Sequence, residues 1–292
     1  MQIGLFAPIT NPVATPEYVA LFARAAEERG FHSLWLGEHV VLFDEYRSAY
    51  PYAENGKIPL PGESGLLEPH TTLGFLAAVT SRIRLATGIC LVPQRNPVYT
   101  AKEIATLDWL SGGRIDFGVG IGWLREEFES LGVPWQRRAA RTREYLEVMK
   151  RLWCDDITEH SGEFYELPAC RFFPKPIQKP HPPIYFGGEG TAALRRVADL
   201  GQGWHPLDLD PEELRLRLAE LETLLAERGR SRADIQVAVC SFTRPLDLDL
   251  AKRYRDAGVD QVTTTVFAAD ADRLQQRLDR LAREVLEPAR SL

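Results

Sequence analysis

Short apolar segments alternate with longer amphipathic segments along the chain, and this alternation constrains the fold more than any other feature. The apolar segments predict strands at residues 3–7, 33–37, 83–90, 115–121, 184–186, 203–204, 235–241 and 261–265. The amphipathic segments predict helices at 16–29, 69–80, 97–110, 137–153, 191–200, 211–228, 248–257 and 270–286. Strands that alternate with helices lie parallel, with the helices outside the sheet. About eight such pairs predict an α/β fold of the (β/α)8 TIM-like barrel type, and a doubly wound open sheet is the alternative.

Two long irregular segments, about residues 40–68 and 155–183, interrupt this alternation and are rich in proline. Because the composition does not change along the chain, we interpret both as insertions in a single barrel domain that spans residues 1–292. Long loops in a compact domain are usually functional. We expect both insertions at the C-terminal face of the barrel, where active sites lie.

The composition excludes several classes of function. A net charge of −6 disfavours a nucleic-acid-binding surface, and no run of about 18 apolar residues is present to span a membrane. The four cysteines form no C-x-x-C motif, so metal sites and disulfides lack support and a cytoplasmic location is expected.

Gly118, Gly120 and Gly122 alternate at the end of the strand predicted at 115–121. Alternate strand residues share a face, so this face carries no side chains, and a flat group can lie against the bare backbone. The G-x-G-x-G spacing departs from the dinucleotide fingerprint G-x-G-x-x-G, which also needs an acidic residue about 20 positions later. Arginine stands there instead, at Arg137, Arg138, Arg141 and Arg143. The alternative is that the glycines only relieve crowding inside a narrow barrel.

Several phrases, in order, resemble the bacterial-luciferase-like superfamily. They cover residues 35–39, 85–97, 101–128, 174–176, 182–188 and 203–204, and the resemblance extends from about residue 3 to residue 205. The phrase at 122–134 is similar to the branch that uses the deazaflavin coenzyme F420, whereas other branches use reduced FMN with oxygen. The resemblance implies a TIM-like barrel, a homodimer, and a cofactor ring at the C-terminal mouth.

The resemblance assigns the cofactor ring to two strand ends. Gly120, Ile121 and Gly122 are expected beside the ring. Thr87, Gly88 and Ile89 are expected to form a bulge against it, which in the superfamily often contains a non-prolyl cis peptide. A plain buried strand is the alternative for the second segment.

The turn at 186–191 is rich in glycine and precedes a predicted helix. Unpaired N–H groups and the positive end of the helix dipole suit a phosphate there, and the superfamily holds the cofactor phosphate at this turn. Gly188, Gly190 and Thr191 are therefore candidate phosphate ligands. F420 and FMN both carry a phosphate, and an ordinary helix cap at Thr191 is the alternative.

His39 and Trp123 are the candidate catalytic residues. His39 follows the second strand, and histidine can give or take the proton that accompanies hydride transfer. Glu38 is not expected to pair with it, since adjacent strand residues face opposite ways. Trp123 stands where the similar F420-dependent glucose-6-phosphate dehydrogenases carry an acidic residue, so that activity is disfavoured and Trp123 is expected to wall an apolar substrate.

These observations predict an F420-dependent oxidoreductase that transfers hydride between the deazaflavin C5 and an apolar organic substrate. An FMNH2-dependent luciferase-like monooxygenase is the first alternative, and a non-catalytic protein that binds flavin or F420 is the second. Tyr50, Tyr52 and His70 lie in or beside the first insertion and are expected to serve packing more than binding. The arginines after the glycine strand are expected to form a solvated helix face, with the glutamate tail of F420 as their alternative partner.

Overall fold

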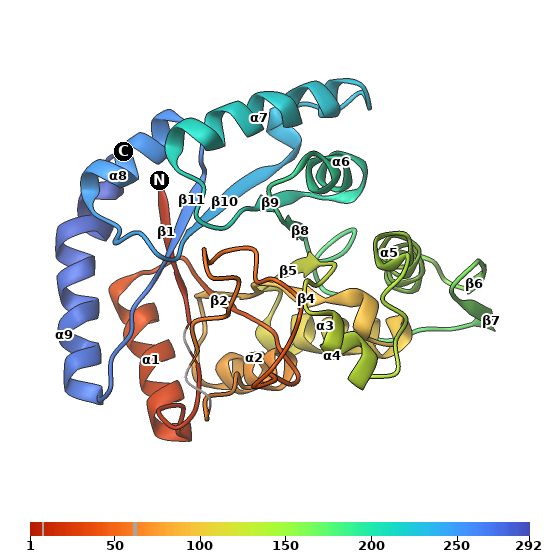
Figure 1. The fold of residues 1–292 in the computed structure, drawn as a ribbon, viewed down its shortest axis with the longest axis horizontal. Helices are drawn as coiled ribbons and strands as arrows, with labels where there is room; N and C mark the ends of the chain where they lie inside the picture. The colour runs from red at the N-terminus through yellow and green to blue at the C-terminus, as the bar shows by residue number, and fades with distance from the viewer. Residues whose placement is uncertain (8, 61–62) are drawn as a thin grey trace.

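Eight parallel strands close into a barrel in the computed structural model, which describes residues 1–7, 9–60 and 63–292 (Figure 1). The strands in chain order are β1 (Gln2–Phe6), β2 (Ser33–Leu36), β3 (Arg84–Thr87), β5 (Ile115–Gly120), β8 (Ile184–Gly187), β9 (Gly203–His205), β10 (Gln236–Ser241) and β11 (Gln261–Thr265). Parallel pairing of β1 with β11 and of β3 with β5 completes the circle. The predicted (β/α)8 barrel is confirmed, and the open sheet is excluded.

Helices follow the strands and surround the barrel. They are α1 (Pro16–Arg29), α2 (Pro69–Val79), α3 (Pro97–Ser111), α4 (Arg125–Ser130), α5 (Arg138–Cys154), α6 (Thr191–Leu200), α7 (Pro211–Ala226), α8 (Leu248–Asp256), α9 (Ala271–Leu281) and α10 (Glu287–Ala289). Local sequence sets their ends: Thr15 accepts the N–H of Tyr18 before α1, and Gly30 ends this helix at a φ of 82°. The short helix α4 was not predicted, and the predicted helix 270–286 changes to a π-turn after Leu281.

Aromatic side chains pack inside the barrel. Trp35 meets Tyr185 edge to face, with ring centroids 5.2 Å apart, and stacks on His205 at 4.0 Å. Burial lowers the pKa of His205 to about 4, and its Nδ1 lies 2.6 Å from the carbonyl oxygen of Ala238. This histidine is therefore a neutral packing residue in the barrel.

The strand predicted at 83–90 is interrupted. β3 ends at Thr87, the Gly88–Ile89 peptide bond is cis, and β4 (Cys90–Leu91) continues along β5. The bulge expected from the resemblance is therefore present, and the plain-strand alternative is wrong.

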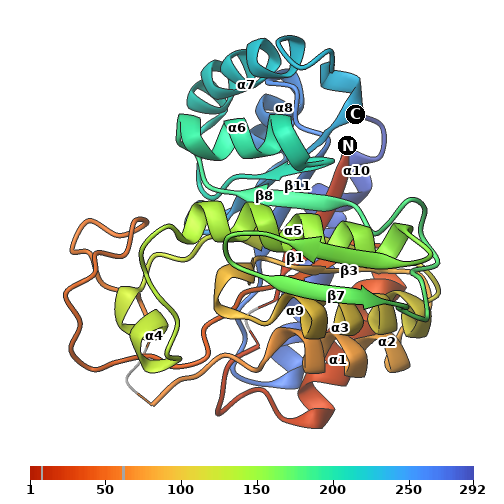
Figure 2. The ribbon, with the colours of Figure 1, turned by 90° about the vertical axis from the view of Figure 1, so that its right-hand side faces the viewer.

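The two insertions lie in different places. The first follows β2, and Figure 2 shows it with α4 at one end of the barrel while both chain termini lie at the other end. The second follows α5 and leads into β8, so the expectation that it follows a strand is wrong, although its turn reaches the start of α5, where Glu163 pairs with Arg137. It contains an antiparallel hairpin, β6 (Thr158–Ser161) and β7 (Glu166–Cys170), whose turn donates backbone N–H groups to Glu144 of α5.

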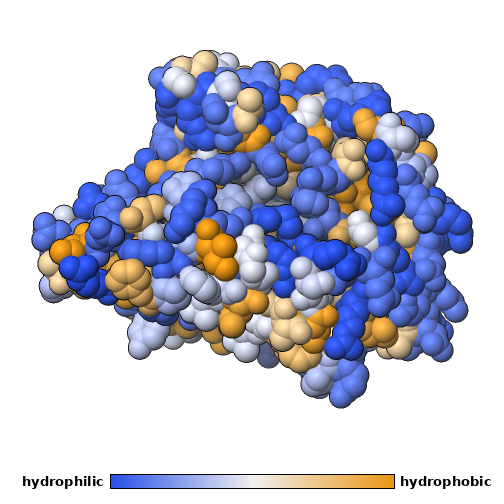
Figure 3. Space-filling view, turned by 180° about the vertical axis from the view of Figure 1, so that it is seen from behind, coloured by the Kyte–Doolittle hydropathy of each residue, from blue (hydrophilic) through white to orange (hydrophobic). Residues whose placement is uncertain are grey.

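The face shown in Figure 3, seen from behind relative to Figure 1, is largely hydrophilic, with hydrophobic side chains in small separate groups. Among the described residues, no helix has the length and apolarity needed to cross a membrane.

Gly118 is a position where the barrel tolerates no side chain. A Cβ atom there would overlap the carbonyl oxygen of Thr87 in the neighbouring strand. We expect Gly118→Ala to lower the free energy of unfolding by about 3 kcal/mol through overpacking, as measured by chemical denaturation.

Gly74 provides the matched control, since it lies inside α2 and its nearest neighbour would be Leu107 at 3.7 Å. Gly74→Ala is expected to raise stability by about 0.5–1 kcal/mol. Equal stability of the Gly118→Ala variant and the native chain would contradict the close approach of β3 and β5.

Candidate active site

His39 lies just beyond β2, between a carboxylate and an indole. Its Nδ1 is 3.3 Å from Oε2 of Glu127, and its Nε2 accepts the indole N–H of Trp123 at 3.3 Å. Since an indole can only donate, the proton of the neutral imidazole belongs on Nδ1, where it faces Glu127. Both predicted catalytic residues therefore meet, although 84 positions separate them in the sequence.

Glu127 holds this end of the barrel together and was missed by the sequence analysis. It is fully buried on α4 and accepts the N–H of Val40 at 2.7 Å and the side-chain amide of Gln94 at 3.0 Å. Burial raises the pKa of its carboxyl, but the bonds from His39, Gln94 and Val40 outweigh burial and lower the pKa below its usual value. The residue lies inside the phrase 122–134, but nothing in its spacing indicated a partner in another loop.

Glu38 faces away from His39, as expected. Its carboxylate accepts Nε of Arg95 at 2.8 Å and the backbone N–H of Leu91. Glu38 thereby ties the end of β2 to the segment after β4.

Aromatic residues of the first insertion surround Trp123. The ring centroids of Tyr50 and Tyr46 lie 5.1 Å and 5.8 Å from that of Trp123, both at steep angles. Burial raises the pKa of Tyr50 to about 12, so its hydroxyl stays protonated. Tyr46 was not singled out from the sequence, and His70 lies elsewhere, buried beside Glu103 at 2.8 Å.

Ile89 fills the space in front of the glycine strand. A Cβ atom on Gly120 would overlap Cδ1 of Ile89, and one on Gly187 would lie 2.6 Å from the same atom. The first group against Gly120 is therefore a side chain of the protein, rather than open space for a ring. A cofactor contact at Gly120 stays a prediction, and any such contact has to share the site with Ile89.

The remaining predicted ring residues have structural partners of their own. Thr87 is buried and its hydroxyl donates to the carbonyl oxygen of Gly118 at 2.6 Å. Gly122 has a φ of 77°, and a Cβ atom there would lie 2.7 Å from the ring of Phe128. Ile121 is half-buried between these glycines. Their contacts with a cofactor stay predictions.

The glycine-rich turn between β8 and α6 presents an open helix N-terminus. Gly188 has a φ of 93°, and its carbonyl accepts the indole N–H of Trp204 at 2.9 Å. Gly190 and Thr191 are exposed, and a Cβ atom on Gly190 would meet no heavy atom within 4 Å. The first N–H groups of a helix have no partner within the helix, so this turn has the donors and the space that a phosphate needs.

A half-buried acid lies in the same turn. Glu189 accepts the N–H of Leu207 at 2.9 Å and the hydroxyl of Tyr52 at 3.3 Å. Burial raises the pKa of Glu189 above its usual value, against the lowering effect of these two bonds. Tyr52 thus connects the first insertion to the turn.

Most of the arginines after the glycine strand have structural partners. Arg137 pairs with Glu163, Arg141 donates to the carbonyl oxygens of Pro93 and Pro134, and Arg143 pairs with Asp199 at 2.6 Å. The guanidinium of Arg138 stacks on the ring of Trp135, and its Nε–H donates to the carbonyl oxygen of Gly122 at 3.2 Å. Arg141 is buried, so the expected solvated helix face does not include it.

Within the described part of the chain, no group of three or more His, Cys, Asp or Glu side chains is arranged to hold a metal ion.

A closed (β/α)8 barrel with ionisable groups at its C-terminal rim is the arrangement of TIM-barrel enzymes. The sequence model of the luciferase-like monooxygenases matches residues 1–291, so the chain belongs to the luciferase-like family of oxidoreductases. The predicted resemblance is confirmed.

Three known proteins are similar to this chain in sequence or in fold. An uncharacterised protein of Mycobacterium tuberculosis is 35% identical over 285 residues, which is 97% of this chain and 98% of that protein. The FMNH2-dependent dimethylsulfone monooxygenase of Pseudomonas putida is 35% identical over 177 residues, or 60% of this chain and 48% of that protein. The F420-dependent tetrahydromethanopterin reductase of Methanopyrus kandleri has the same fold, with a TM-score of 0.75, 20% identity and 98% of each chain covered.

Glu127 makes a testable contribution to stability. Because its pKa is lowered in the folded chain, the stabilisation is complete above the unfolded pKa and is lost as the pH falls through the folded value. We therefore expect Glu127→Gln to be less stable than the native chain near neutral pH, and the difference to shrink below about pH 5.

Urea denaturation from pH 7 to pH 3 measures this difference. The matched control is Glu129→Gln, which alters an exposed carboxylate of the same helix that pairs with Arg125. A difference for Glu127→Gln that stays constant over this range would contradict an ionised Glu127.

Proposed function

We propose that this protein is an F420-dependent oxidoreductase that transfers hydride between the deazaflavin C5 and an organic substrate with an apolar part. The observation that carries the proposal is the arrangement at His39, which lies at the barrel mouth with Glu127 on one side and Trp123 on the other. Support for F420 comes from the phrase 122–134 and from the shared fold with an F420-dependent reductase.

Bound F420 would supply or accept the hydride. The residues of the chain would exchange the proton, orient the reacting groups and exclude water. His39 would exchange a proton through Nε2, the nitrogen that faces Trp123. Glu127 would hold the imidazole by Nδ1 and stabilise the charged form when Nε2 takes up a proton. Trp123 and Tyr50 would exclude water from the substrate and favour an apolar group.

The turn before α6 fits the phosphate that the cofactor carries. Gly188 gives the turn its left-handed conformation, and Gly190 and Thr191 leave the first N–H groups of α6 exposed. Anions bind at such helix N-termini through these N–H groups and the helix dipole. Ile89, which fills the space before Gly120 and Gly187, would support the ring from the barrel side.

A second candidate is an FMNH2-dependent monooxygenase on the same barrel. It is favoured by the 35% identity to the dimethylsulfone monooxygenase over 177 residues. Since FMN also carries a phosphate, the turn at Gly188 suits both cofactors, and binding measurements have to decide between them.

Cofactor affinity is the first test. We expect the purified chain to bind F420 at least about tenfold more tightly than FMN, a difference of about 1.4 kcal/mol, in fluorescence titrations. Gly188→Ala is expected to weaken F420 binding, because a φ of 93° strains any residue with a Cβ atom.

Gly74→Ala is the control for this titration, since Gly74 lies inside α2, outside the glycine-rich turn, and the added Cβ atom would meet only Leu107, at 3.7 Å. Its affinity should equal that of the native chain. Tight FMN binding without F420 binding would refute the first candidate in favour of the monooxygenase.

Turnover is the second test. With F420H2 and a panel of organic acceptors, followed by the absorbance of oxidised F420, we expect the native chain to oxidise the cofactor. His39→Ala should lower kcat by about 100-fold or more, the usual size of a general acid–base contribution, while the Kd for F420 stays within about twofold.

The same substitution at His32, His32→Ala, serves as a control. His32 lies at the opposite end of β2, where its backbone bonds to Ile3 and Arg84. Unchanged turnover in His39→Ala would remove His39 from the mechanism. F420 binding without oxidation by any acceptor would favour the non-catalytic alternative.

A further inference from the structure

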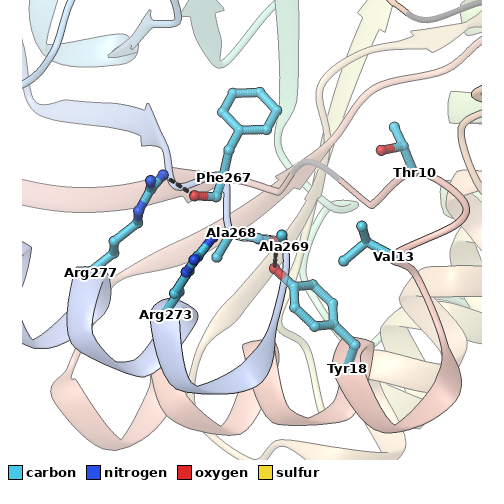
Figure 4. A pocket seen from close by; sticks show the side chains of 8 residues that line it. All are labelled: Thr10, Val13, Tyr18, Phe267, Ala268, Ala269, Arg273 and Arg277. Carbon is cyan, nitrogen blue, oxygen red and sulfur yellow. Dashed lines mark hydrogen bonds between the residues drawn. The ribbon is translucent and has the colours of Figure 1, made fainter.

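A cavity opens at the rim of the barrel, where β1 and β11 end. It has a volume of about 310 Å³ and is lined by Thr10, Val13, Tyr18, Phe267, Ala268, Ala269, Arg273 and Arg277. Figure 4 shows Arg273 and Arg277 on successive turns of α9 along one side, with Tyr18, Val13 and Thr10 on the other. No residue of the His39 cluster belongs to this lining.

The described lining of the cavity carries positive charge, which Asp270 beside Arg273 partly offsets. Both charged side chains among its described lining residues are arginines. Arg277 donates to the carbonyl oxygen of Phe267, and Arg273 lies 3.4 Å from Asp270, whose carboxylate also caps α9 by accepting the N–H of Arg273 at 2.8 Å. Each guanidinium has five N–H donors, so these contacts leave most of the donors open to a ligand.

The other walls are apolar or neutral. Phe267 is 50% exposed although it is a large hydrophobic residue, and Val13 and Ala268 are half-buried beside it. The hydroxyl of Tyr18 donates to the carbonyl oxygen of Ala268 at 3.0 Å, and burial raises the pKa of Tyr18, so it stays neutral. A ligand that fits has to combine a negative group with a hydrophobic one.

The cavity is also tied to the active-site loop. Thr10 pairs with Leu66 of the first insertion, and the side-chain amide of Asn11 donates to the carbonyl oxygen of Glu63 at 2.9 Å. The same insertion carries Tyr50 against Trp123. The segment that lines the cavity at Thr10 is therefore bonded to the insertion that also packs on Trp123.

We propose that this cavity binds a small organic anion, in which a carboxylate or phosphate group is joined to a hydrophobic group. Arg273 and Arg277 hold the anionic group, and Phe267 and Val13 contact the hydrophobic group. Guanidinium groups bind both carboxylate and phosphate through paired N–H donors. The site stands independently of the cofactor proposed for the barrel mouth.

Isothermal titration with benzoate and with phenyl phosphate tests the proposal and distinguishes the two anions. We expect saturable binding of at least one of them at a single site. Arg273→Gln should weaken that binding by about tenfold or more, the loss expected when a charged hydrogen bond is removed. Phe267→Ala should weaken the same binding through the loss of the hydrophobic contact.

Arg280→Gln is the matched control, because Arg280 lies on the same helix, is exposed and pairs with Glu284 at 2.9 Å outside the cavity. It should bind like the native chain. Equal weakening in Arg273→Gln and Arg280→Gln would reduce the effect to overall charge and overturn the proposal, as would an absence of saturable binding for both probes. Thermal unfolding of each variant verifies that the fold is intact.

Discussion

The close approach of β3 and β5 is the constraint on which the barrel mouth depends. Gly118 allows the carbonyl of Thr87 to approach the neighbouring strand, and the hydroxyl of Thr87 bonds the carbonyl of Gly118 in return. Past this contact the chain turns through Gly88 and sends Ile89 into the space left by Gly120 and Gly187. The space that these glycines leave is therefore filled by the side chain of Ile89, which lines the mouth of the barrel.

A single buried carboxylate connects this mouth to the loops above it. Glu127 belongs to a helix of six residues, which has little stability of its own. Its bonds to His39 and Val40 connect α4, which follows β5, to the segment after β2. Its bond to Gln94 connects α4 to the segment after β4. An unpaired buried carboxylate is strongly unfavourable, so these donors and Glu127 stabilise one another, and the orientation of His39 results from that mutual dependence.

Sequence reasoning succeeded where the pattern is local and failed where the contact is distant. The strands and most helices followed from periodicity and from caps such as Thr15 and Gly30. The helix α4 is too short to show a period, and the hairpin β6–β7 is largely exposed, so its strands lack an apolar pattern. His39 was singled out because it follows a strand, and Trp123 because it stands where the similar F420-dependent glucose-6-phosphate dehydrogenases carry an acidic residue. Glu127 was missed because its partner His39 lies 88 positions away, and only the closed barrel brings the two together.

The position of Trp123 limits what His39 can do. The lone pair of Nε2 accepts a hydrogen bond from the indole N–H, and the N–H of Nδ1 faces the carboxylate of Glu127. Both ring nitrogens of the neutral imidazole are therefore already hydrogen-bonded within the protein. A substrate that exchanges a proton with Nε2 has to displace the indole, and the bond is long enough, at 3.3 Å, to be given up without a large loss. Once Nε2 carries a proton, the indole can no longer bond it, while the attraction of Glu127 for the charged ring increases. Protonation of Nε2 would therefore break the hydrogen bond that holds the indole of Trp123 against His39.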